Sequence, residues 1–463
     1  MIAIVESRAD EASVNICEQL RTVTDWERHE DRNRPDADGG GPYYRRDGFE
    51  LRSFDALHLE LDRAAEAFDE RPAFLVFASR HSGGTGPLLT GHFTGNFGPA
   101  EYGGADRSVA EAAPNVLPAL LEAFDEFAPD GYDVGMECTH HGPTDVGCPS
   151  LFVELGSDEA QWADEEAAEA VARAILALDG VEPNRTIPSA ADAGLSGTTD
   201  APARHLVGFG GGHYVPRFER IVRETPWAVG HVAPEWALET LEDPATETDL
   251  LCEAFEASAA AFAVVEGEHP DLTDAIDALG YRVVSESWIR EVGDRSQSLV
   301  EAVETALGPI AEGVRFGERR SSSFEVVTLP TDLIEACEGI DPDRSWDIVT
   351  AEAVAVETTN GGTRLGERIA VPEDAGPTAP SGLPRRVVDG LAGVLRDGFD
   401  QVRVADDVIE VETAAFDPDL ASDLGIPDGP AFGALAGGES VTVDGTEIDP
   451  EAVHVTRTDR FPL

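Results

Sequence analysis

The sequence contains no lysine, and all 33 of its basic residues are arginine. The 90 Asp and Glu residues outnumber them, so the formal net charge is −57. The acidic residues are spread along the chain and 42% of the residues are hydrophobic, which favours a folded protein with a carboxylate surface over a disordered acidic tail. The acidic side chains of such a surface repel one another in dilute buffer. Molar salt removes most of this repulsion, because it shortens the screening length to about 3 Å. The composition therefore predicts a cytoplasmic protein of an extreme halophile, with the binding of cationic partners as the alternative.

Cysteine is scarce as well. The five cysteines are odd in number, irregularly spaced and never arranged as Cys-x-x-Cys, which argues against a disulfide framework. No run of about 18 apolar residues could span a bilayer, and the N-terminus lacks the basic region and long apolar core of a signal peptide. We therefore expect a reducing, cytoplasmic setting and no contact with a membrane.

Short apolar runs alternate with helical patterns over the first two thirds of the chain. Turn signals bound predicted strands at 1–5, 49–59, 74–79, 132–136, 150–155 and 204–209. Helical spacing predicts helices at 11–22, 108–127, 158–178, 249–265 and 296–307. This alternation predicts an α/β fold with a mixed, mostly parallel central sheet flanked by helices. Residues 80–104 are predicted to form one long glycine-rich loop, and 182–202, rich in Pro, Ser, Gly and Thr, an insertion.

The composition of the chain changes near 318–323. Of the eleven histidines, His454 alone lies beyond that point. We therefore predict a catalytic domain over residues 1–317 and a smaller C-terminal α+β accessory domain over 324–463, without a catalytic cluster of its own.

The stretch from Glu137 to Gly156 lies between two predicted strands and holds a carboxylate, two adjacent imidazoles, a Gly-Pro turn and two thiols. In open α/β sheets, ligands bind just beyond the carboxyl ends of the strands. This segment is therefore predicted to form the floor of an active site, where three loops distant in the sequence bring their imidazoles together at the rim of the sheet.

Histidine is concentrated in the same part of the chain. Seven of the eleven lie between 81 and 231: His81, His92, His140, His141, His205, His213 and His231. A catalytic zinc needs three protein ligands and an open position, where bound water ionises near neutral pH. No spacing-specific zinc signature is present, so three interpretations stay open: metal ligation by some of these histidines with Glu137, metal-free acid/base catalysis, or structural hydrogen bonding.

The positions of neighbouring side chains suggest separate roles in metal binding, proton transfer and substrate binding. In an extended backbone His140 and His141 would point to opposite sides, so that one could bind metal and the other transfer protons. Cys138 and Cys148 are soft metal ligands or small buried hydrophobic residues, and a cysteine nucleophile paired with a histidine is a third alternative. The glycines from Gly208 to Gly212 either form a tight turn that lets His213 reach the site or cradle a phosphate or ribose.

Several motifs together resemble one family. "SRHSGG…LLTGHFTGNFG…YGG", "ECTHHGPTDVGCPSLFVELGS…W" and "GFGGGHYVPRF…GHVAP" occur here in the order found in the archaeal and plant type of D-aminoacyl-tRNA deacylase. The likeness spans roughly residues 1–315, and the acidic composition points to a haloarchaeal member. The resemblance implies hydrolysis of the ester between a D-amino acid and tRNA, with mischarged glycyl-tRNA as a further substrate. It also implies zinc dependence, a fold like nucleoside phosphorylases and peptidyl-tRNA hydrolases, and a monomer.

The resemblance carries over residue by residue onto the histidines of these motifs and Glu137. We predict as zinc ligands His81, His92, His140 and His213. We predict as catalytic residues Glu137, His140 and His141, of which an uncoordinated one takes the proton from water. We predict as substrate-binding residues Arg80, Gly210, Gly211, Gly212, Tyr214 and Arg217. Rejection of the L-isomer is expected to come from a clash of its side chain with the pocket.

The net charge argues against the binding of tRNA, because so acidic a surface repels phosphates. Molar salt screens that repulsion beyond a few ångströms. Recognition is then expected at the acceptor end alone, through stacking of the terminal adenosine and through Arg80, Arg217 and Arg220. No binding of DNA is expected.

Three other functions remain open from the residues alone. One is a zinc-dependent peptidase or amidohydrolase acting on small molecules. Another is an enzyme like the nucleoside phosphorylases, which phosphate dependence would reveal. The last is a non-catalytic RNA-binding protein whose histidine cluster is structural.

Overall fold

The computed structural model describes residues 1–184, 204–241, 243–426, 428–443 and 445–463. The chain divides into two compact units, Met1–Asp294 and Arg295–Leu463. Almost all of the predicted insertion at 182–202 lies outside the described residues.

The first unit is built on an eight-stranded sheet of order β2-β3-β4-β1-β5-β10-β6-β9. The strands are β1 (Ile2–Ser7), β2 (Glu27–Asp31), β3 (Gly41–Arg46), β4 (Phe49–Phe54), β5 (Phe74–Ser82), β6 (Leu88–His92), β9 (Asp133–Met136) and β10 (Ser150–Ser157). The central strands β4, β1, β5 and β10 are parallel, β6 is antiparallel to β10, and β9 is parallel to β6. The prediction of a mixed α/β fold with a mostly parallel central sheet is therefore confirmed.

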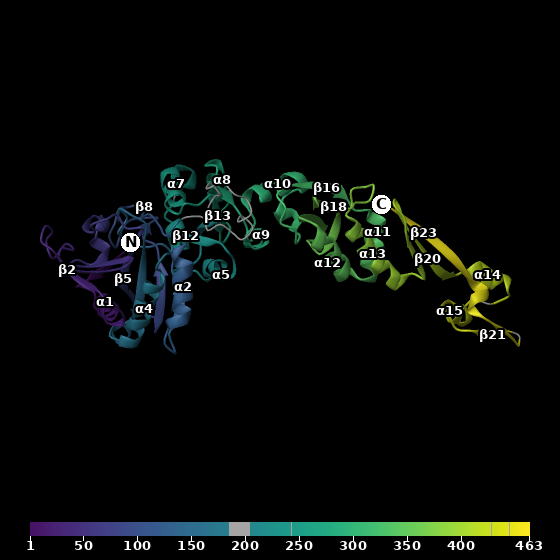
Figure 1. The fold of residues 1–463 in the computed structure, drawn as a ribbon, viewed down its shortest axis with the longest axis horizontal. Coiled ribbons are helices and arrows are strands. Elements are labelled where there is room, and N and C mark those ends of the chain that lie inside the picture. Colours follow the sequence, from purple (N-terminus) through teal and green to yellow (C-terminus); the bar gives the residue numbers. More distant parts are fainter. Residues whose placement is uncertain (185–203, 242, 427, 444) are drawn as a thin grey trace. The chain divides into compact units, whose positions relative to one another are not determined.

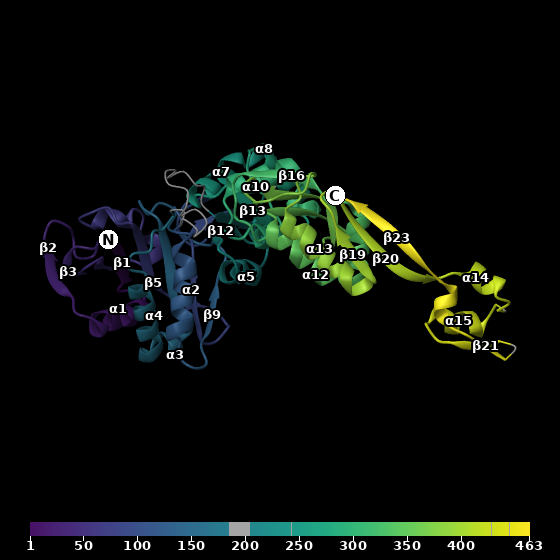
Figure 2. The same ribbon diagram turned by 45° about the vertical axis from the view of Figure 1, so that its right-hand side comes forward.

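Helices and loops cover opposite faces of this sheet. The helices α1 (Glu11–Val23), α4 (Glu165–Ala177) and α2 (Val116–Phe127) lie side by side along one face (Figures 1 and 2). The other face carries a core of Phe77, Phe152 and their neighbours, packed under residues of the loops after β4 and β9. Every residue of β1 and β10 is buried, as expected for strands covered on both faces.

Several predicted boundaries were wrong. Residues 80–104 are not one loop, because β5 continues to Ser82 and β6 forms within the glycine-rich stretch. The glycine at position 91 belongs to that strand: a Cβ there would lie 2.7 Å from Leu120, so α2 packs closely against it. The predicted helix at 158–178 is two helices, α3 (Glu159–Trp162) and α4, each with its own aspartate cap.

Two further helices begin or end elsewhere than predicted. The helix predicted at 108–127 starts at Val116, because 108–109 form β8 (Ser108–Val109) and pair with β7 (Gly95–Asn96). The helix predicted at 249–265 ends early as α7 (Thr248–Ala257), and β13 (Phe262–Val265) follows it.

A second, parallel sheet of order β12-β11-β13-β14 completes the first unit. Its other strands are β11 (His205–Phe209), β12 (Ala228–Ala233) and β14 (Arg282–Val283). The helix α5 (Pro216–Glu224) lies on one face, where Phe218 packs on Gly208. Figure 1 shows α7 and α8 (Pro270–Ala278) on the other face, over a core that includes Phe209 and Phe255.

The second unit is α+β. Its larger sheet is antiparallel, of order β15-β17-β18-β16, and a three-stranded sheet β19-β20-β23 follows. The elements are α10 (Gln297–Leu307), β15 (Arg315–Phe316), β16 (Phe324–Thr328), α11 (Thr331–Ile340), α12 (Pro342–Glu352), β17 (Ala355–Thr359), β18 (Arg364–Pro372), α13 (Arg385–Gly398), β19 (Gln401–Val404), β20 (Val408–Phe416), α14 (Pro418–Asp423), α15 (Pro430–Ala436), β21 (Val441–Val443), β22 (Thr446–Ile448) and β23 (His454–Pro462).

The two compact units do not divide at the predicted domain boundary between 317 and 324. Because β15 pairs with β17, and Arg368 of β18 donates to the backbone at the end of α10, residues 295–317 belong to the second unit. The catalytic and accessory roles assigned to the two parts stay predictions. Within the described residues no helix is long and apolar enough to cross a bilayer.

Candidate functional site

Histidine rings from four segments meet in the first unit, as the motifs predicted. His81 lies in β5, His92 at the end of β6, His140 and His141 after β9, and His213 after β11. The ring centroids of His92 and His140 are 4.2 Å apart, those of His140 and His213 4.7 Å, and those of His81 and His213 6.1 Å. The predicted convergence of the imidazoles is therefore confirmed.

The cluster stands on a face of the central sheet, not beyond its rim. In the register of the sheet, His81 lies opposite Gly156, and His92 opposite Phe152. Since side chains alternate between faces along a strand, His81, His92 and Glu154 all project to the face that the loops cover. The site is consequently walled by loops.

Backbone hydrogen bonds tie the segment after β9 to both sheets. The amide of Cys138 donates to the carbonyl of His213 (2.8 Å), and that of Thr139 donates to Val232 in β12 (2.9 Å). The Thr139 hydroxyl accepts from the Val232 amide and donates to Nδ1 of His231, whose Nε2 donates to the carbonyl of Ala110 (2.7 Å). Burial lowers the pKa of His231 to about 4, so this histidine is a neutral structural link.

The prediction that His140 and His141 point to opposite sides was wrong. The backbone of His141 has φ 46°, a left-handed conformation that turns the chain, and the two ring centroids are 4.4 Å apart. Nδ1 of His140 donates to the carbonyl of Cys138 (2.9 Å) and Nδ1 of His141 to that of Gly142 (2.8 Å). Because a carbonyl can only accept, both rings are protonated on Nδ1, and both leave the Nε2 lone pair free.

The charge state of these rings follows from burial. Burial and the neighbouring His92 lower the pKa of His140 well below its usual value, and they lower the pKa of His141 to about 3. A neutral imidazole with a fixed tautomer is the form that binds metal or accepts a proton.

Glu137 is at the centre of the cluster and only 2% exposed. Its Oε2 lies 2.8 Å from Nε2 of His213 and 3.6 Å from Nε2 of His140, and its Oε1 lies 3.1 Å from Nδ1 of His81. None of these contacts has the direction of a hydrogen bond, and both carboxylate oxygens lack a hydrogen-bond partner. Burial opposes its charge, but His213 and His81 hold the pKa of Glu137 well below its usual range. A buried, ionised carboxylate without a hydrogen bond needs another partner.

The donor atoms fit a metal ion. Sets of donor atoms within 4.8 Å of one another are His92–His140–His141, His81–Glu137–His213, Cys138–His140–His213 and His92–Glu137–Glu154. The unpartnered Nε2 of His92 and the unpartnered oxygens of Glu137 belong to these sets. Imidazole nitrogens and a carboxylate are the ligands that zinc prefers. The four predicted ligands do not form one set but are divided between these groups.

Cys138 and Cys148 lie in different surroundings. Cys138 belongs to one of these sets, but burial and then Glu137 raise the pKa of its thiol, which disfavours the thiolate that binds metal. Cys148 packs in the apolar core with Phe77 and Phe152, as a small hydrophobic residue does.

Sequence reasoning missed Glu154. This residue of β10 is 3% exposed, with Oε2 at 3.4 Å from Nδ1 of His81 and Oε1 at 3.6 Å from Nε2 of His92. Burial opposes the protonation of His81, but the two carboxylates Glu137 and Glu154 raise the pKa of His81 to about 11. The available signal was a lone carboxylate inside an otherwise apolar buried run, since a charge is rarely buried without a partner.

A cavity of about 390 Å³ opens over the cluster. Its lining consists of Asp10, Leu57, His58, Leu59, Ser79, Arg80, His81, Ser82, Tyr102, His140, His141, Phe152, Glu154 and His213. His58 is a second residue that sequence reasoning missed; it is buried between Phe77 and Phe152 with Nε2 3.4 Å from the hydroxyl of Ser13. The cavity is large enough for an amino acid and part of a nucleotide.

Comparisons with known proteins identify the family of the chain. The family model for D-aminoacyl-tRNA deacylase matches residues 68–284. A D-aminoacyl-tRNA deacylase of Halorubrum lacusprofundi is 52% identical over 100% of this chain and 97% of its own length, and one of Natronomonas pharaonis is 48% identical over 100% of both. The chain belongs to the D-aminoacyl-tRNA deacylase family.

More distant members and a solved structure extend the comparison. The D-aminoacyl-tRNA deacylase of Methanoregula boonei is 30% identical over 84% of this chain and 85% of its own length. The crystal structure of a conserved protein of unknown function, 28% identical, superposes with a TM-score of 0.52 over 63% of this chain and 96% of that chain. The haloarchaeal relatives named above align with the whole chain, so D-aminoacyl-tRNA deacylases of this group share the second unit as well as the first.

The remaining predicted substrate-binding residues of this deacylase fall into three places. Tyr214 supports the cluster, because its hydroxyl lies 2.8 Å from Nε2 of His81. Gly210 and Gly211 have φ 96° and 83°, and a Cβ on Gly210 would lie 2.3 Å from the carbonyl oxygen of Glu266. With Gly212, they form the tight turn that brings His213 to the site, and none of the three lines the cavity.

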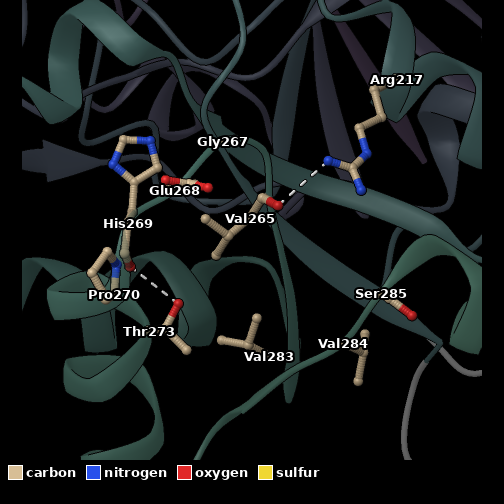
Figure 3. Close-up of a pocket in the computed structure, with 10 residues that line it drawn as sticks. All are labelled: Arg217, Val265, Gly267, Glu268, His269, Pro270, Thr273, Val283, Val284 and Ser285. Atoms are coloured by element: carbon tan, nitrogen blue, oxygen red, sulfur yellow. Dashed lines mark hydrogen bonds between the residues drawn. The ribbon is translucent and has the colours of Figure 1, made fainter. Parts of the chain in front are cut away.

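Arg217 lies in a different cavity. Figure 3 shows it reaching from α5 to the carbonyl of Val265, across from His269, in a hollow of about 540 Å³ at the carboxyl ends of β13 and β14. Arg220 pairs with Glu286 on the surface. Of the three arginines expected at the acceptor end, Arg80 therefore lines the histidine cavity and the other two do not.

The close approach of β5 and β10 offers a test of the deacylase cluster. A Cβ on Gly156 would lie 2.5 Å from Cβ of His81 and 2.6 Å from its carbonyl oxygen. Gly156→Ala is therefore expected to displace His81 and to reduce kcat by at least roughly tenfold, with a loss of about 1–3 kcal/mol in unfolding free energy. Steady-state deacylation and thermal unfolding measure the two effects.

Gly135→Ala in β9 is the matched control. A Cβ on Gly135 would meet nothing closer than 3.5 Å, so this variant should keep both activity and stability. Equal behaviour of the two variants would show that His81 does not depend on the close strand packing.

Proposed function

We propose that this protein hydrolyses the ester bond of D-aminoacyl-tRNA, releasing free tRNA and the D-amino acid, with a zinc ion in the histidine cluster. The observation that carries the proposal is the pair of neutral imidazoles, His140 and His141, that line a cavity close to the buried carboxylate of Glu137. An aminoacyl ester is already activated, so a positioned water and stabilisation of the oxyanion suffice for its hydrolysis.

His92, His140 and His141 would hold the metal, because they offer three Nε2 atoms in rings whose Nδ1 atoms face backbone carbonyls. The adjoining His81, Glu137 and His213 would stay uncoordinated, which leaves Glu137 and His213 available for proton transfer. When bound, a zinc ion lowers the pKa of its water towards about 7 and polarises the ester carbonyl.

Glu137 is proposed as the proton acceptor. Its lowered pKa keeps it ionised at neutral pH, and its Oε2 is in reach of His213. His213 has a side chain that is 40% exposed, so it can meet the leaving 3′-oxygen of the ribose and return the proton there. Glu154 positions both His81 and His92, one on each of its oxygens.

Chiral selection is proposed to reside in the walls of the cavity. Phe152 and Leu57 line it together with the histidines. With the ester and the α-ammonium held in place, the two enantiomers direct their side chains to different walls, and the L-isomer would clash.

We also propose that the fold of the first unit is akin to nucleoside phosphorylases and peptidyl-tRNA hydrolases, that the enzyme is a cytoplasmic monomer, and that the second unit is accessory to catalysis. The parallel strands β4, β1, β5 and β10 with helices on one face support the first point.

The test is a comparison of four substrates in molar KCl: D-tyrosyl-tRNA, L-tyrosyl-tRNA, D-tyrosine ethyl ester and D-tyrosinamide. We expect kcat/KM for D-tyrosyl-tRNA to exceed that for L-tyrosyl-tRNA by at least roughly 10²-fold, and the small ester and amide to be poor substrates. Faster turnover of the amide than of D-tyrosyl-tRNA would make the protein a small-molecule amidohydrolase.

A further inference from the structure

One aromatic ring stands exposed at the mouth of the histidine cavity. Tyr102 is 67% exposed and lines the cavity together with Leu59, Arg80 and His141. Among the described residues, Tyr102 is the most exposed of the large hydrophobic side chains, and none of the other exposed ones lines this cavity. An exposed aromatic ring that lines a cavity offers a flat face on which a base can stack.

The backbone beneath this ring is held firmly. The carbonyl of Tyr102 accepts the amide of Gly142 (2.9 Å), next to His141. The side chain of Asn96 donates to the carbonyls of Gly103 (2.9 Å) and Ala105 (3.1 Å). Gly103 has φ 77°, and a Cβ there would lie 2.2 Å from the carbonyl oxygen of Leu59, so no other residue fits this contact. The ring is thus presented on an ordered loop, which reduces the entropy lost on binding.

A cation without a carboxylate partner lines the same cavity. The guanidinium of Arg80 lies 5.1 Å from the ring centroid of Trp162, and no ion pair of Arg80 occurs among the described residues. Trp162 is itself fixed, because its Nε1 donates to the carbonyl of His81 (2.9 Å). In a chain with 90 acidic and 33 basic residues, an arginine left without a carboxylate is available to an anion from outside.

We propose that Tyr102 is the stacking platform for the terminal adenine of the tRNA and that Arg80 binds the phosphate of that nucleotide. This inference rests on the proposed function. The base is the occupant favoured over the amino acid because Tyr102 stands at the mouth, whereas the histidines that meet the ester lie deeper. Stacking also survives molar salt, in which attraction between charges extends only about 3 Å. Each base has a π-face, and one base–aromatic stack contributes about 1–3 kcal/mol.

Adenosine 5′-monophosphate is the probe, because it carries both the base and the phosphate but no aminoacyl ester. Tyr102→Ala is expected to raise KM for D-tyrosyl-tRNA and the Kd of the probe by the same factor, roughly 5- to 150-fold, with kcat unchanged. Tyr102→Phe keeps the ring and should behave like the unchanged protein. Arg80→Gln should weaken the binding of the monophosphate but not that of adenosine, since adenosine lacks the phosphate.

Trp236→Ala is the matched control, since Trp236 is an aromatic residue with 51% exposure outside the cavity lining. In this variant, KM for D-tyrosyl-tRNA and the Kd of the probe should not change. Because the Tyr102 ring is exposed and its hydrogen bond is made by the backbone, thermal unfolding of Tyr102→Ala should match that of the control.

Each of these measurements tests whether the terminal adenine stacks on Tyr102. An unchanged KM and Kd in Tyr102→Ala overturns the proposal, as does a loss confined to kcat. An effect that grows with the size of the amino acid while the probe binds normally also overturns it, because the ring would then contact the amino acid. Calorimetric binding of the probe does not depend on turnover, so failure of the deacylase assay is distinguishable from failure of the stacking site.

Discussion

Removal of bound metal is expected to abolish turnover of D-tyrosyl-tRNA. Dialysis against a strong chelator should lower kcat by at least roughly 10³-fold, because water ionises near pH 7 on zinc and near pH 15.7 in bulk. The physical basis is the convergence of His92, His140 and His141 beside a buried carboxylate without a hydrogen bond, with Nε2 unprotonated in His140 and His141. Steady-state deacylation before and after dialysis, with metal content measured on the same samples, gives the result.

The control for this experiment is the return of metal. Added zinc should restore activity to the dialysed protein, while magnesium, which prefers oxygen ligands, should not. Circular dichroism of the dialysed sample in molar KCl would exclude unfolding as the cause. Full activity in protein shown to be free of metal would remove the ion from the mechanism and favour acid/base catalysis by the histidines alone.

Replacement of Glu137 by glutamine is expected to have the second large effect. The amide has nearly the same shape but no charge, and its NH₂ group cannot accept a proton. We expect kcat to fall by roughly 10²–10⁴-fold, as for the loss of a general base. The folded state should survive, because His81 keeps Glu154 as a partner at 3.4 Å. Single-turnover deacylation with saturating enzyme separates this loss from any change in substrate binding.

Glu50→Gln is the matched control for a buried carboxylate. Glu50 is 1% exposed and pairs with Arg52 at 2.6 Å, away from the histidine cluster. Breaking a buried ion pair costs about 3–5 kcal/mol, so this variant should unfold at a lower temperature with kcat unchanged. If Glu137→Gln lost stability in the same way and kept its kcat, Glu137 would be a structural residue.

The predicted loop at 80–104 was wrong because a short strand within it contains glycine. The stretch from 80 to 104 has the composition of a loop, yet Leu88–His92 forms a strand because β10 supplies its hydrogen bonds and α2 packs on Gly91. Local composition cannot report such long-range pairing, since the partners are more than fifty residues away in the sequence.

The prediction that His140 and His141 point to opposite sides was wrong for a different reason. An extended backbone would separate adjacent side chains, but the left-handed conformation at His141 places both rings on one side. Such a conformation is rare outside glycine and is maintained by its surroundings, here by Gly142 packing on the backbone of Gly104 and donating to Tyr102.

By itself, the sequence determined the family, the mixed α/β class and the histidines that meet, because these depend on residue identity, motif order and periodicity along the chain. Only the tertiary structure decided that Glu154 joins them, that Arg217 lies elsewhere and that Tyr102 stands at the cavity mouth. The physical reason is register: which side chains share a face of β5, β10 and β6 is set by pairing between strands, and which loop residues reach that face is set by packing between distant segments.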